Sequence, residues 1–353
     1  MNNKKYINLL FASTSDYMKN AAVTIMSAID NLEDNVGINI YYLYADVFNP
    51  IDDTRRNDLI EQILYTFKDN DVNFNFIDVT DKMCLFENLN VGMWEKEMSL
   101  THYMYLLAPL FVENVDKLIY LDCDVVVNCN LCKIYDIDME DKLIAMASPS
   151  GFEVEADTSN SGLSLINLKQ WKKEDILHTL IKFGENLPKG DFCDQYLLNE
   201  YFKKRHLDRL TLIDKTYNIF PMTYPELSLD EIKNLHYAGP NLKPWNEMEC
   251  MCRGSFLWWK YARKTAFYES FIDDYFKNKL NILKQDFEYK LYLQNQQDEE
   301  IRRQIYDNMQ QMIKDYDMKK YKSSLLYLCF VRPYKCLLKT FVAIRISFFE
   351  DVL

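Results

Sequence analysis

The chain has 353 residues, enough for one large domain or two modest ones. Hydrophobic residues make up 48% of it, which can build a large core, and the scarcity of glycine (8) and proline (9) excludes collagen-like and low-complexity chains. The formal net charge of −12 at pH 7 argues against nucleic-acid binding through a broad basic surface, so we expect no nucleic-acid partner.

The elements expected in the N-terminal part alternate between strands and helices. Apolar or β-rich runs predict strands at 7–12, 38–44, 72–79 and 117–121, and helical spacing predicts helices at 17–31, 52–67 and 101–112. Strands separated by helical crossovers predict an α/β fold, with a mostly parallel sheet and helices on both faces. Ligands of such folds bind at the carboxyl ends of the strands.

The next part of the chain predicts further buried strands at 143–147 and 163–168, and helices at 169–182 and 191–204. Residues 273–320 contain no glycine and no proline, and they predict one or two long amphipathic helices. Three roles stay open for this helical extension. It could mediate dimerisation, support the tail or form part of an acceptor-binding wall.

The C-terminal tail, residues 318–353, carries seven basic residues against two acidic ones, interleaved with apolar and aromatic residues. A cationic amphipathic segment on an acidic body predicts binding to an anionic membrane surface in the headgroup region. The alternative is a helix that packs its apolar face on the body.

The nine cysteines are odd in number and scattered, which does not fit a secreted disulfide framework. Cys129 and Cys132 form a CxxC pair without a suitable second pair, so reduced, partly buried thiols are a simpler interpretation than a zinc site. The polar start of the chain and the absence of a long apolar run predict neither a signal peptide nor a membrane span. We therefore expect a cytoplasmic protein, peripherally bound to the cytoplasmic membrane.

Two carboxylates, Asp122 and Asp124, follow an apolar predicted strand and are separated by one residue. Positions i and i+2 of an extended chain point to the same face, so both project where the strand meets its ligand. A divalent cation relieves the repulsion between adjacent carboxylates. Oxygen ligands favour Mg²⁺ or Mn²⁺, and an added imidazole favours Mn²⁺. Asp-x-Asp alone is also common in solvated turns.

His236 is one of only four histidines and stands before a Gly-Pro turn, with Lys243 close behind. An imidazole can complete a metal site, while the Gly239 amide and the Lys243 ammonium can hold phosphate oxygens. A buried histidine beside an ordinary loop is the alternative.

Five blocks in order resemble glycosyltransferase family 8, the retaining sugar-nucleotide transferases that include bacterial lipopolysaccharide galactosyl- and glucosyltransferases and glycogenin. The blocks are Phe11-Ala12-Ser13 to Ser27, Leu121-Asp122-Cys123-Asp124, Asn160-Ser161-Gly162 to Trp171, Asp194-Gln195 to Asn199, and His236 to Trp245. With a trailing match at Trp258 to Thr265, the similarity covers residues 5–272. It implies a GT-A, Rossmann-like nucleotide-sugar domain at 1–272, followed by a helical extension at 273–317 and the tail at 318–353.

The resemblance also implies a role for each matched residue. Asp122, Asp124 and His236 would bind Mn²⁺ or Mg²⁺, and Asp194 and Gln195 would flank the anomeric carbon as catalytic residues. The implied UDP-sugar contacts are Ala12, Ser13, Asp16, Tyr17, Asp122, Cys123, Asp124, Asn160, Asp194, Gln195, His236, Gly239 and Lys243. Within that set, the Tyr17 ring stacks on uracil and Asn160 contacts the donor sugar.

The implied reaction moves glucose or galactose from a UDP-sugar to a hydroxyl of a lipopolysaccharide or other surface-glycan or glycolipid acceptor. The cation and Lys243 would stabilise the charge on departing UDP. An uncharged amide such as Gln195 is a poor nucleophile, and Asp194 is expected to orient a sugar hydroxyl. We therefore favour front-face attack over double displacement.

Three positions depart from the family pattern. Thr14 and Pro149 stand where the family has an aspartate, and Tyr105 stands where many members have an arginine near the donor. These departures leave the donor sugar open. They also keep two alternatives, a catalytically weak UDP-sugar-binding protein and a protein-glycosylating, glycogenin-like enzyme.

Overall fold

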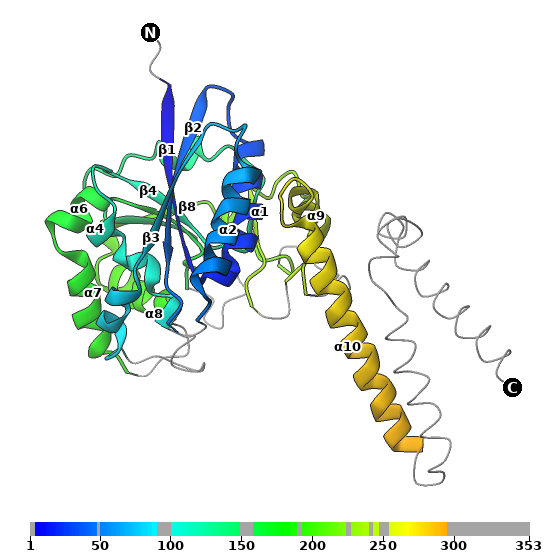
Figure 1. Cartoon of the computed structure of the whole chain (residues 1–353). Helices are drawn as coiled ribbons and strands as arrows, with labels where there is room; N and C mark the ends of the chain where they lie inside the picture. Colours follow the sequence, from blue (N-terminus) through cyan, green and yellow to red (C-terminus); the bar gives the residue numbers. More distant parts are fainter. Residues whose placement is uncertain are drawn as a thin grey trace, which may run out of the picture. The chain divides into compact units, whose positions relative to one another are not determined.

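The computed structural model describes residues 4–47, 50–89, 100–148, 158–188, 193–223, 227–239, 243–246 and 254–294 (Figure 1). Its contacts divide the chain into two units, 1–279 and 280–353, and in the second unit only the helical residues 280–294 are described. Pro149, residues 295–317 and the predicted membrane-binding tail lie outside the described residues. The predicted domain boundaries at 272 and 317 stay predictions.

A seven-stranded sheet forms the centre of the first unit. Its strands, in chain order, are β1 (Lys5–Ser13), β2 (Val36–Tyr44), β3 (Val72–Asp78), β4 (Leu118–Leu121), β6 (Ile144–Ala147), β7 (Leu163–Ile166) and β8 (Leu210–Ile213). They lie in the order β3-β2-β1-β4-β7-β6-β8, and all neighbours pair in parallel except those that involve β7. The predicted α/β fold with a mostly parallel sheet is confirmed. The sequence analysis did not predict β8.

The α-helices are α1 (Met18–Asp30), α2 (Asp53–Thr66), α4 (Ala108–Phe111), α5 (Cys132–Tyr135), α6 (Leu168–Lys173), α7 (Ile176–Glu185), α8 (Cys193–Leu198), α9 (Ser255–Ala262) and α10 (Tyr268–Gln294). Short 3₁₀ turns include η3 (Met104–Leu107) and η6 (Lys215–Tyr217), so the helix predicted at 101–112 is a 3₁₀ turn followed by one α-turn. Most residues of the helical segment predicted at 169–182 are helical, but they form two helices rather than one. Asp175 adopts a left-handed conformation (φ 48°), which ends α6 and starts α7 anew.

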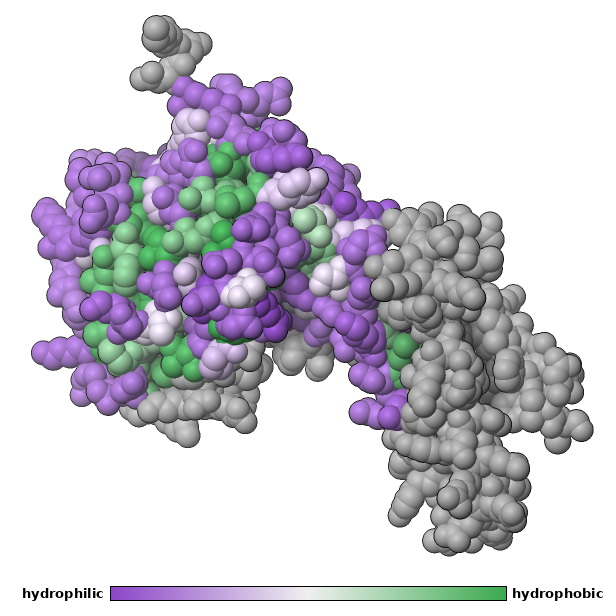
Figure 2. Space-filling view, viewed as in Figure 1, coloured by the Kyte–Doolittle hydropathy of each residue, from purple (hydrophilic) through white to green (hydrophobic). Residues whose placement is uncertain are grey.

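Two apolar layers cover the sheet, one on each face. Successive β1 side chains alternate between them, so Leu9 packs in the layer with α1 and Leu10 packs in the layer with Trp171. Burying one such leucine contributes about 1.5–3 kcal/mol. Figure 1 shows α1 and α2 on one side of the strands and α6 and α7 on the other. Only Ile63 of α2 is fully buried. The face of the molecule in Figure 2 mixes hydrophilic and hydrophobic side chains, and the exposed hydrophobic side chains include Leu64 and Tyr65 of α2.

The strand order places a switch point between β1 and β4. From β1 the chain moves outward to β2 and β3, then returns to pair β4 on the opposite side of β1. The carboxyl ends of strands at such a point are the usual ligand site of open α/β sheets. Ala12 and Ser13 end β1, and Asp122 directly follows β4.

A second, two-stranded sheet pairs β5 (Val125–Val127) with β9 (Asn234–His236) in antiparallel register. Val125 lies opposite His236, and the Tyr237 amide donates to the Asp124 carbonyl at 3.0 Å. This pairing places His236 beside Asp124, more than a hundred residues away in the chain, at the end of β4. The sequence analysis did not predict it.

Candidate functional site

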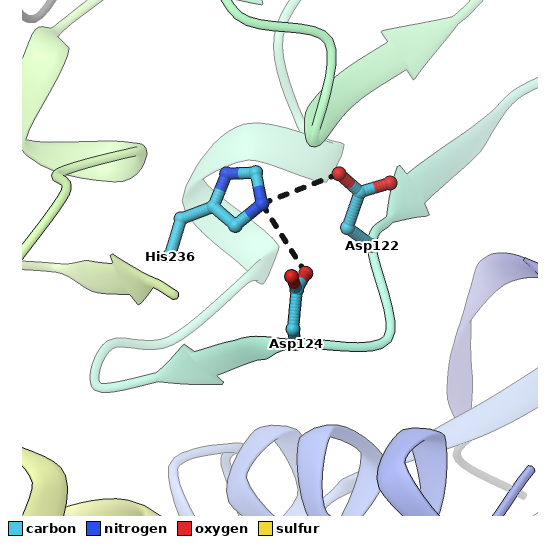
Figure 3. Close-up of side chains that lie close together, drawn as sticks. All are labelled: Asp122, Asp124 and His236. Atoms are coloured by element: carbon cyan, nitrogen blue, oxygen red, sulfur yellow. Dashed lines mark ion pairs between the residues drawn. The ribbon is translucent and has the colours of Figure 1, made fainter. Parts of the chain in front are cut away.

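Asp122, Asp124 and His236 converge beyond the carboxyl end of β4 (Figure 3). His236 Nε2 lies 3.3 Å from Asp122 Oδ2 and 3.2 Å from Asp124 Oδ1. Neighbouring ligands of an octahedral ion with bonds of about 2.1 Å lie about 3 Å apart, so these separations fit one divalent cation. Among the described residues, this is the one group of His, Cys, Asp or Glu side chains with metal-binding geometry.

Neighbouring charges set the pKa values within this metal-binding triad. Burial alone would lower the pKa of His236, but Asp124 and Asp122 raise it to about 9. Burial would raise the pKa of Asp124, yet Lys243 and His236 hold it well below its usual value. Asp124 is therefore a buried, ionised ligand, and its charge is balanced by the Lys243 ammonium and by His236. A bound cation would take over this balance as His236 gives up its Nε2 proton.

Gly162 fits closely against the triad. A Cβ atom there would lie 2.3 Å from His236 Cε1 and 2.7 Å from Asp122 Oδ2. The Gly162 carbonyl also accepts a hydrogen bond from the Asp122 amide at 3.0 Å. Glycine is therefore required because the backbone after Asn160 forms one wall of the metal-binding triad.

Lys243 and Tyr17 both approach the triad. The Lys243 ammonium pairs with Asp124 Oδ2 and lies 5.6 Å from the Trp245 ring centroid. Trp245 in turn contacts Tyr17 edge to face, with centroids 6.0 Å apart. The expected diphosphate and base contacts thus adjoin the metal-binding triad. Gly239 is exposed and left-handed (φ 83°), as a tight turn requires.

The end of β1 packs against the residue between the two aspartates. Ser13 Oγ donates to the Thr14 carbonyl at 2.7 Å and lies 2.6 Å from the Tyr42 hydroxyl. Cys123 Sγ lies 4.0 Å from the Ala12 carbonyl oxygen. Burial raises the pKa of the Cys123 thiol to about 12, so this residue is a neutral packing group between the two blocks.

Asp46 anchors the turn that follows β1. Its carboxylate accepts from the Ser15 amide at 2.8 Å and the Ser15 hydroxyl at 2.6 Å, and it pairs with Arg56 at 3.0 Å. Asp16, an expected donor contact, pairs with Arg55 at 2.5 Å. The sequence analysis missed Asp46, because no local pattern indicates that a residue just after β2 reaches the turn that follows β1.

Asp194 and Gln195, at the start of α8, form the other side of the site. Asp194 is buried and accepts from the Tyr105 hydroxyl at 3.0 Å, and burial raises its pKa. Gln195 Oε1 accepts from Asn160 Nδ2 at 2.7 Å. A π-helical turn (Asn199–Lys203) follows α8, a feature that is frequent at functional sites.

Two stacked tyrosines join the two sides. The Tyr105 and Tyr120 rings lie 3.9 Å apart at 10°, and the Tyr120 hydroxyl donates to Asp122 Oδ1 at 2.5 Å. Tyr105, which stands where many family members have an arginine, therefore gives Asp194 a neutral hydrogen-bond donor instead of a charged one. The sequence analysis missed this role of the tyrosine hydroxyls.

The CxxC pair lies apart from the metal-binding triad. Cys129 and Cys132 are free, Cys132 is buried, and Cys129 Sγ lies 3.7 Å from Asn234 Oδ1. The two residues form no disulfide and are buried or half-buried, and their reduced state stays a prediction. The helices of the described segments include no candidate membrane span.

Comparisons with known proteins agree with this geometry. The model of the family described as Glycosyl transferase family 8 matches residues 8–249. GlyF of Streptococcus pneumoniae, a glycosyltransferase, is 29% identical over 187 residues, which cover 50% of this chain and 44% of GlyF. A putative glycosyltransferase of Haemophilus influenzae is 27% identical over 266 residues, 68% of this chain and 73% of that protein. The chain spans less than half the length of GlyF and the similar pneumococcal protein GlyB.

Solved structures support the fold. The galactosyltransferase LgtC, in complex with donor and acceptor sugar analogues, aligns with a TM-score of 0.56 and 19% identity over 74% of this chain and 96% of LgtC. GlyE of Streptococcus pneumoniae aligns with a TM-score of 0.55 and 23% identity over 77% of this chain and 64% of GlyE. These likenesses identify a GT-A fold. Because the family model covers well over half of the chain and includes the metal-binding triad, the chain belongs to glycosyltransferase family 8.

Proposed function

We propose that the protein is a metal-dependent, retaining hexosyltransferase that moves glucose or galactose from a UDP-sugar to a hydroxyl of a lipopolysaccharide or other surface-glycan acceptor. The observation that carries this proposal is the convergence of Asp122, Asp124 and His236, with Lys243 beside them, at the carboxyl end of β4. Two carboxylates and an imidazole with the spacing of cation ligands, beside a lysine, suit the departure of a diphosphate.

Each side of the site has its own task in this proposal. Bound Mn²⁺ or Mg²⁺ would supply positive charge to the diphosphate of departing UDP. Lys243 exchanges its pairing with Asp124 for a phosphate oxygen, and Tyr17 offers its ring to the uracil base. Asn160, Asp194 and Gln195 orient the sugar and its anomeric carbon.

The surroundings of Asp194 support front-face attack. A covalent nucleophile should be an ionised carboxylate, whereas burial raises the pKa of Asp194 and its carboxyl already accepts a hydrogen bond from Tyr105. The Gln195 amide is uncharged. In this mechanism the acceptor hydroxyl attacks from the face that UDP leaves, and a departing phosphate oxygen takes its proton.

The decisive experiment measures UDP release from UDP-glucose and UDP-galactose with and without Mn²⁺, using glycolipid acceptors. We expect Mn²⁺-dependent turnover and a product with the donor's anomeric configuration, read by NMR. UDP binding without turnover of any UDP-hexose would instead indicate a binding protein, for which Thr14 and Tyr105 are the supporting departures. Labelling of the protein's own tyrosines would indicate a glycogenin-like enzyme.

Peripheral membrane binding is proposed from the sequence of residues 318–353 alone. Reversing the charges of Lys335 and Lys339 to glutamate should release the full chain from anionic liposomes at low salt and leave donor hydrolysis intact. Unchanged sedimentation of that variant with the liposomes would contradict the proposal.

A further inference from the structure

A line of side-chain hydrogen bonds, buried at its His236 end and part-buried at its Gln195 end, crosses the site from the metal-binding triad. His236 Nδ1 lies 2.9 Å from Asn218 Oδ1, and Asn218 Nδ2 donates to Asn160 Oδ1 at 2.9 Å. Asn160 Nδ2 donates to Gln195 Oε1 at 2.7 Å. Asn218 is 2% exposed and directly follows η6, so it stands in the middle of this amide relay with both ends of its side chain engaged.

The direction of every bond in the amide relay is fixed by one backbone group. The Gly162 amide donates to Asn160 Oδ1 at 2.9 Å, and a backbone N–H can only donate. The Asn160 oxygen must therefore face Gly162, and the Asn218 group that meets the same oxygen must be its NH₂. This leaves the Asn218 oxygen facing His236 and the Asn160 NH₂ facing Gln195.

The consequence for His236 is a defined ring state. Because the Asn218 oxygen can only accept, the hydrogen on this side of the ring sits on Nδ1. Nε2 is then the nitrogen that faces Asp122 and Asp124, 3.3 and 3.2 Å away. Histidines that bind metals commonly hold their ring in this way, with the second nitrogen donating to an oxygen.

The consequence for Gln195 is a fixed amide plane. Its oxygen is committed to Asn160, so its NH₂ group is presented to a partner other than Asn160. A substitution at Asn218 therefore removes support from the metal-binding triad and from the Gln195 amide together.

We propose that Asn218 is a positioning residue with two roles. It orients His236 for binding of the cation, and through Asn160 it orients the Gln195 amide at the reacting centre. This inference rests on the proposed function, because it takes the cation and the role of Gln195 from it. It adds a residue that touches neither the metal nor the anomeric carbon.

The test compares two buried asparagines in the full-length protein. Asn167 is the matched control, because it is 8% exposed and uses three hydrogen bonds, to the Met139 and Lys142 carbonyls and from the Gln170 amide, at the start of α6. Both alanine variants should lower the thermal midpoint. Only Asn218→Ala should raise the dissociation constant for Mn²⁺, measured by EPR of free Mn²⁺ without donor, by about 10- to 100-fold.

Turnover at saturating Mn²⁺ separates the effect of Asn218 on His236 from its effect on Gln195. If Asn218 also acts through Gln195, saturating Mn²⁺ does not restore kcat in Asn218→Ala, whereas the KM for the UDP-sugar changes little. In a Gln195→Ala background, Asn218→Ala should cause no further loss of kcat while still weakening Mn²⁺ binding.

Asn218→Asp provides a variant of the same size, in case the alanine variant does not fold. The carboxylate keeps an acceptor towards His236 but cannot donate to Asn160. We expect Mn²⁺ binding to be retained and kcat to fall, a split that loss of folding alone would not produce.

Several results would overturn the inference. These are an unchanged Mn²⁺ dissociation constant in Asn218→Ala, full recovery of kcat at saturating Mn²⁺, or additive losses of kcat with Gln195→Ala. A wild-type protein that binds no Mn²⁺ and releases no UDP would overturn the proposed function and this inference with it. The first group of results would leave the proposed function standing.

Discussion

The two buried carboxylates of the site, Asp124 and Asp194, are held in opposite ways. Asp124 lies between His236 and the Lys243 ammonium, which keep its pKa low despite burial. Asp194 accepts from the neutral Tyr105 hydroxyl, and burial raises its pKa. The difference suits two tasks. The side with Asp124 keeps a negative charge that can bind a cation, whereas the side with Asp194 holds a neutral environment that can orient the uncharged sugar.

The largest effect should come from neutralising the charged side. In Asp124→Asn, the cation loses an anionic ligand, and Lys243 and His236 lose their shared counter-charge. We expect loss of Mn²⁺ binding together with a fall in transfer of more than about 100-fold, since metal assistance supplies several kcal/mol to the transition state. Calorimetric Mn²⁺ titration and UDP release measure the two losses.

An exposed aspartate is the control for that change. Asp138→Asn alters an exposed carboxylate that accepts a hydrogen bond from the nearby Glu140 amide at 3.0 Å, so Mn²⁺ binding and transfer should be unchanged. Transfer by Asp124→Asn at the wild-type rate would show that the charged side does not carry the reaction.

The next largest effect should come from crowding the charged side without altering its charges. Gly162→Ala places a methyl group against the His236 ring and the Asp122 carboxylate, at 2.3 and 2.7 Å. The ligands must separate, so we expect Mn²⁺ affinity to fall about tenfold or more and stability to fall by about 1–3 kcal/mol. Mn²⁺ titration and chemical denaturation measure these changes.

Gly37→Ala is the matched crowding variant. Its methyl group would meet the Tyr6 side chain at 2.4 Å near the amino end of β2, away from the metal-binding triad. Stability should fall, and Mn²⁺ affinity should not. If both variants weakened Mn²⁺ binding equally, the effect would be general loosening of the fold.

A smaller effect is expected on the neutral side. Tyr105→Phe removes the hydroxyl that donates to Asp194 but keeps the ring stacked on Tyr120. Loss of one hydrogen bond to this carboxyl should lower kcat by about tenfold and leave Mn²⁺ affinity unchanged. Steady-state kinetics at saturating Mn²⁺, with a parallel Mn²⁺ titration, test this separation.

Tyr135→Phe removes a comparable hydroxyl, which accepts from Asn8 at 2.7 Å and donates to the Lys117 carbonyl at 3.3 Å. It lies at the amino end of β4, opposite the site, so kcat should not change. A fall in Mn²⁺ affinity in Tyr105→Phe would show that the side with Asp194 also contributes to metal binding, contrary to the proposal.

The sequence predicted the local part of the charged side. Asp122 and Asp124 follow an apolar strand, as predicted, and both carboxylates reach the site. The extended conformation assumed between them is wrong, because residues 123 and 124 form a turn between β4 and β5. The position of His236 needed the family resemblance, because it depends on the pairing of β5 with β9. Asn218, Asp46 and the Tyr105 hydroxyl could not be predicted, since each acts through a buried hydrogen bond to a residue far away in the chain. The break at Asp175 was missed because an aspartate seldom adopts the left-handed conformation that ends α6.

The smallest effect is expected at the CxxC pair, where substitutions test whether a buried group with a raised pKa must be functional. Burial raises the pKa of Cys129 to about 11 and also raises that of Cys132, much as it raises the pKa of Asp194, but neither thiol belongs to the metal-binding triad. Cys129→Ser and Cys132→Ser should therefore leave Mn²⁺ affinity and transfer unchanged. In the native protein, alkylation followed by mass spectrometry should label the exposed Cys84 before Cys129, because a buried thiol with a raised pKa supplies little thiolate. Loss of transfer in either serine variant would contradict this expectation. If chelation also abolished transfer by the wild-type protein and Zn²⁺ restored it, the zinc interpretation of the CxxC pair would be supported instead.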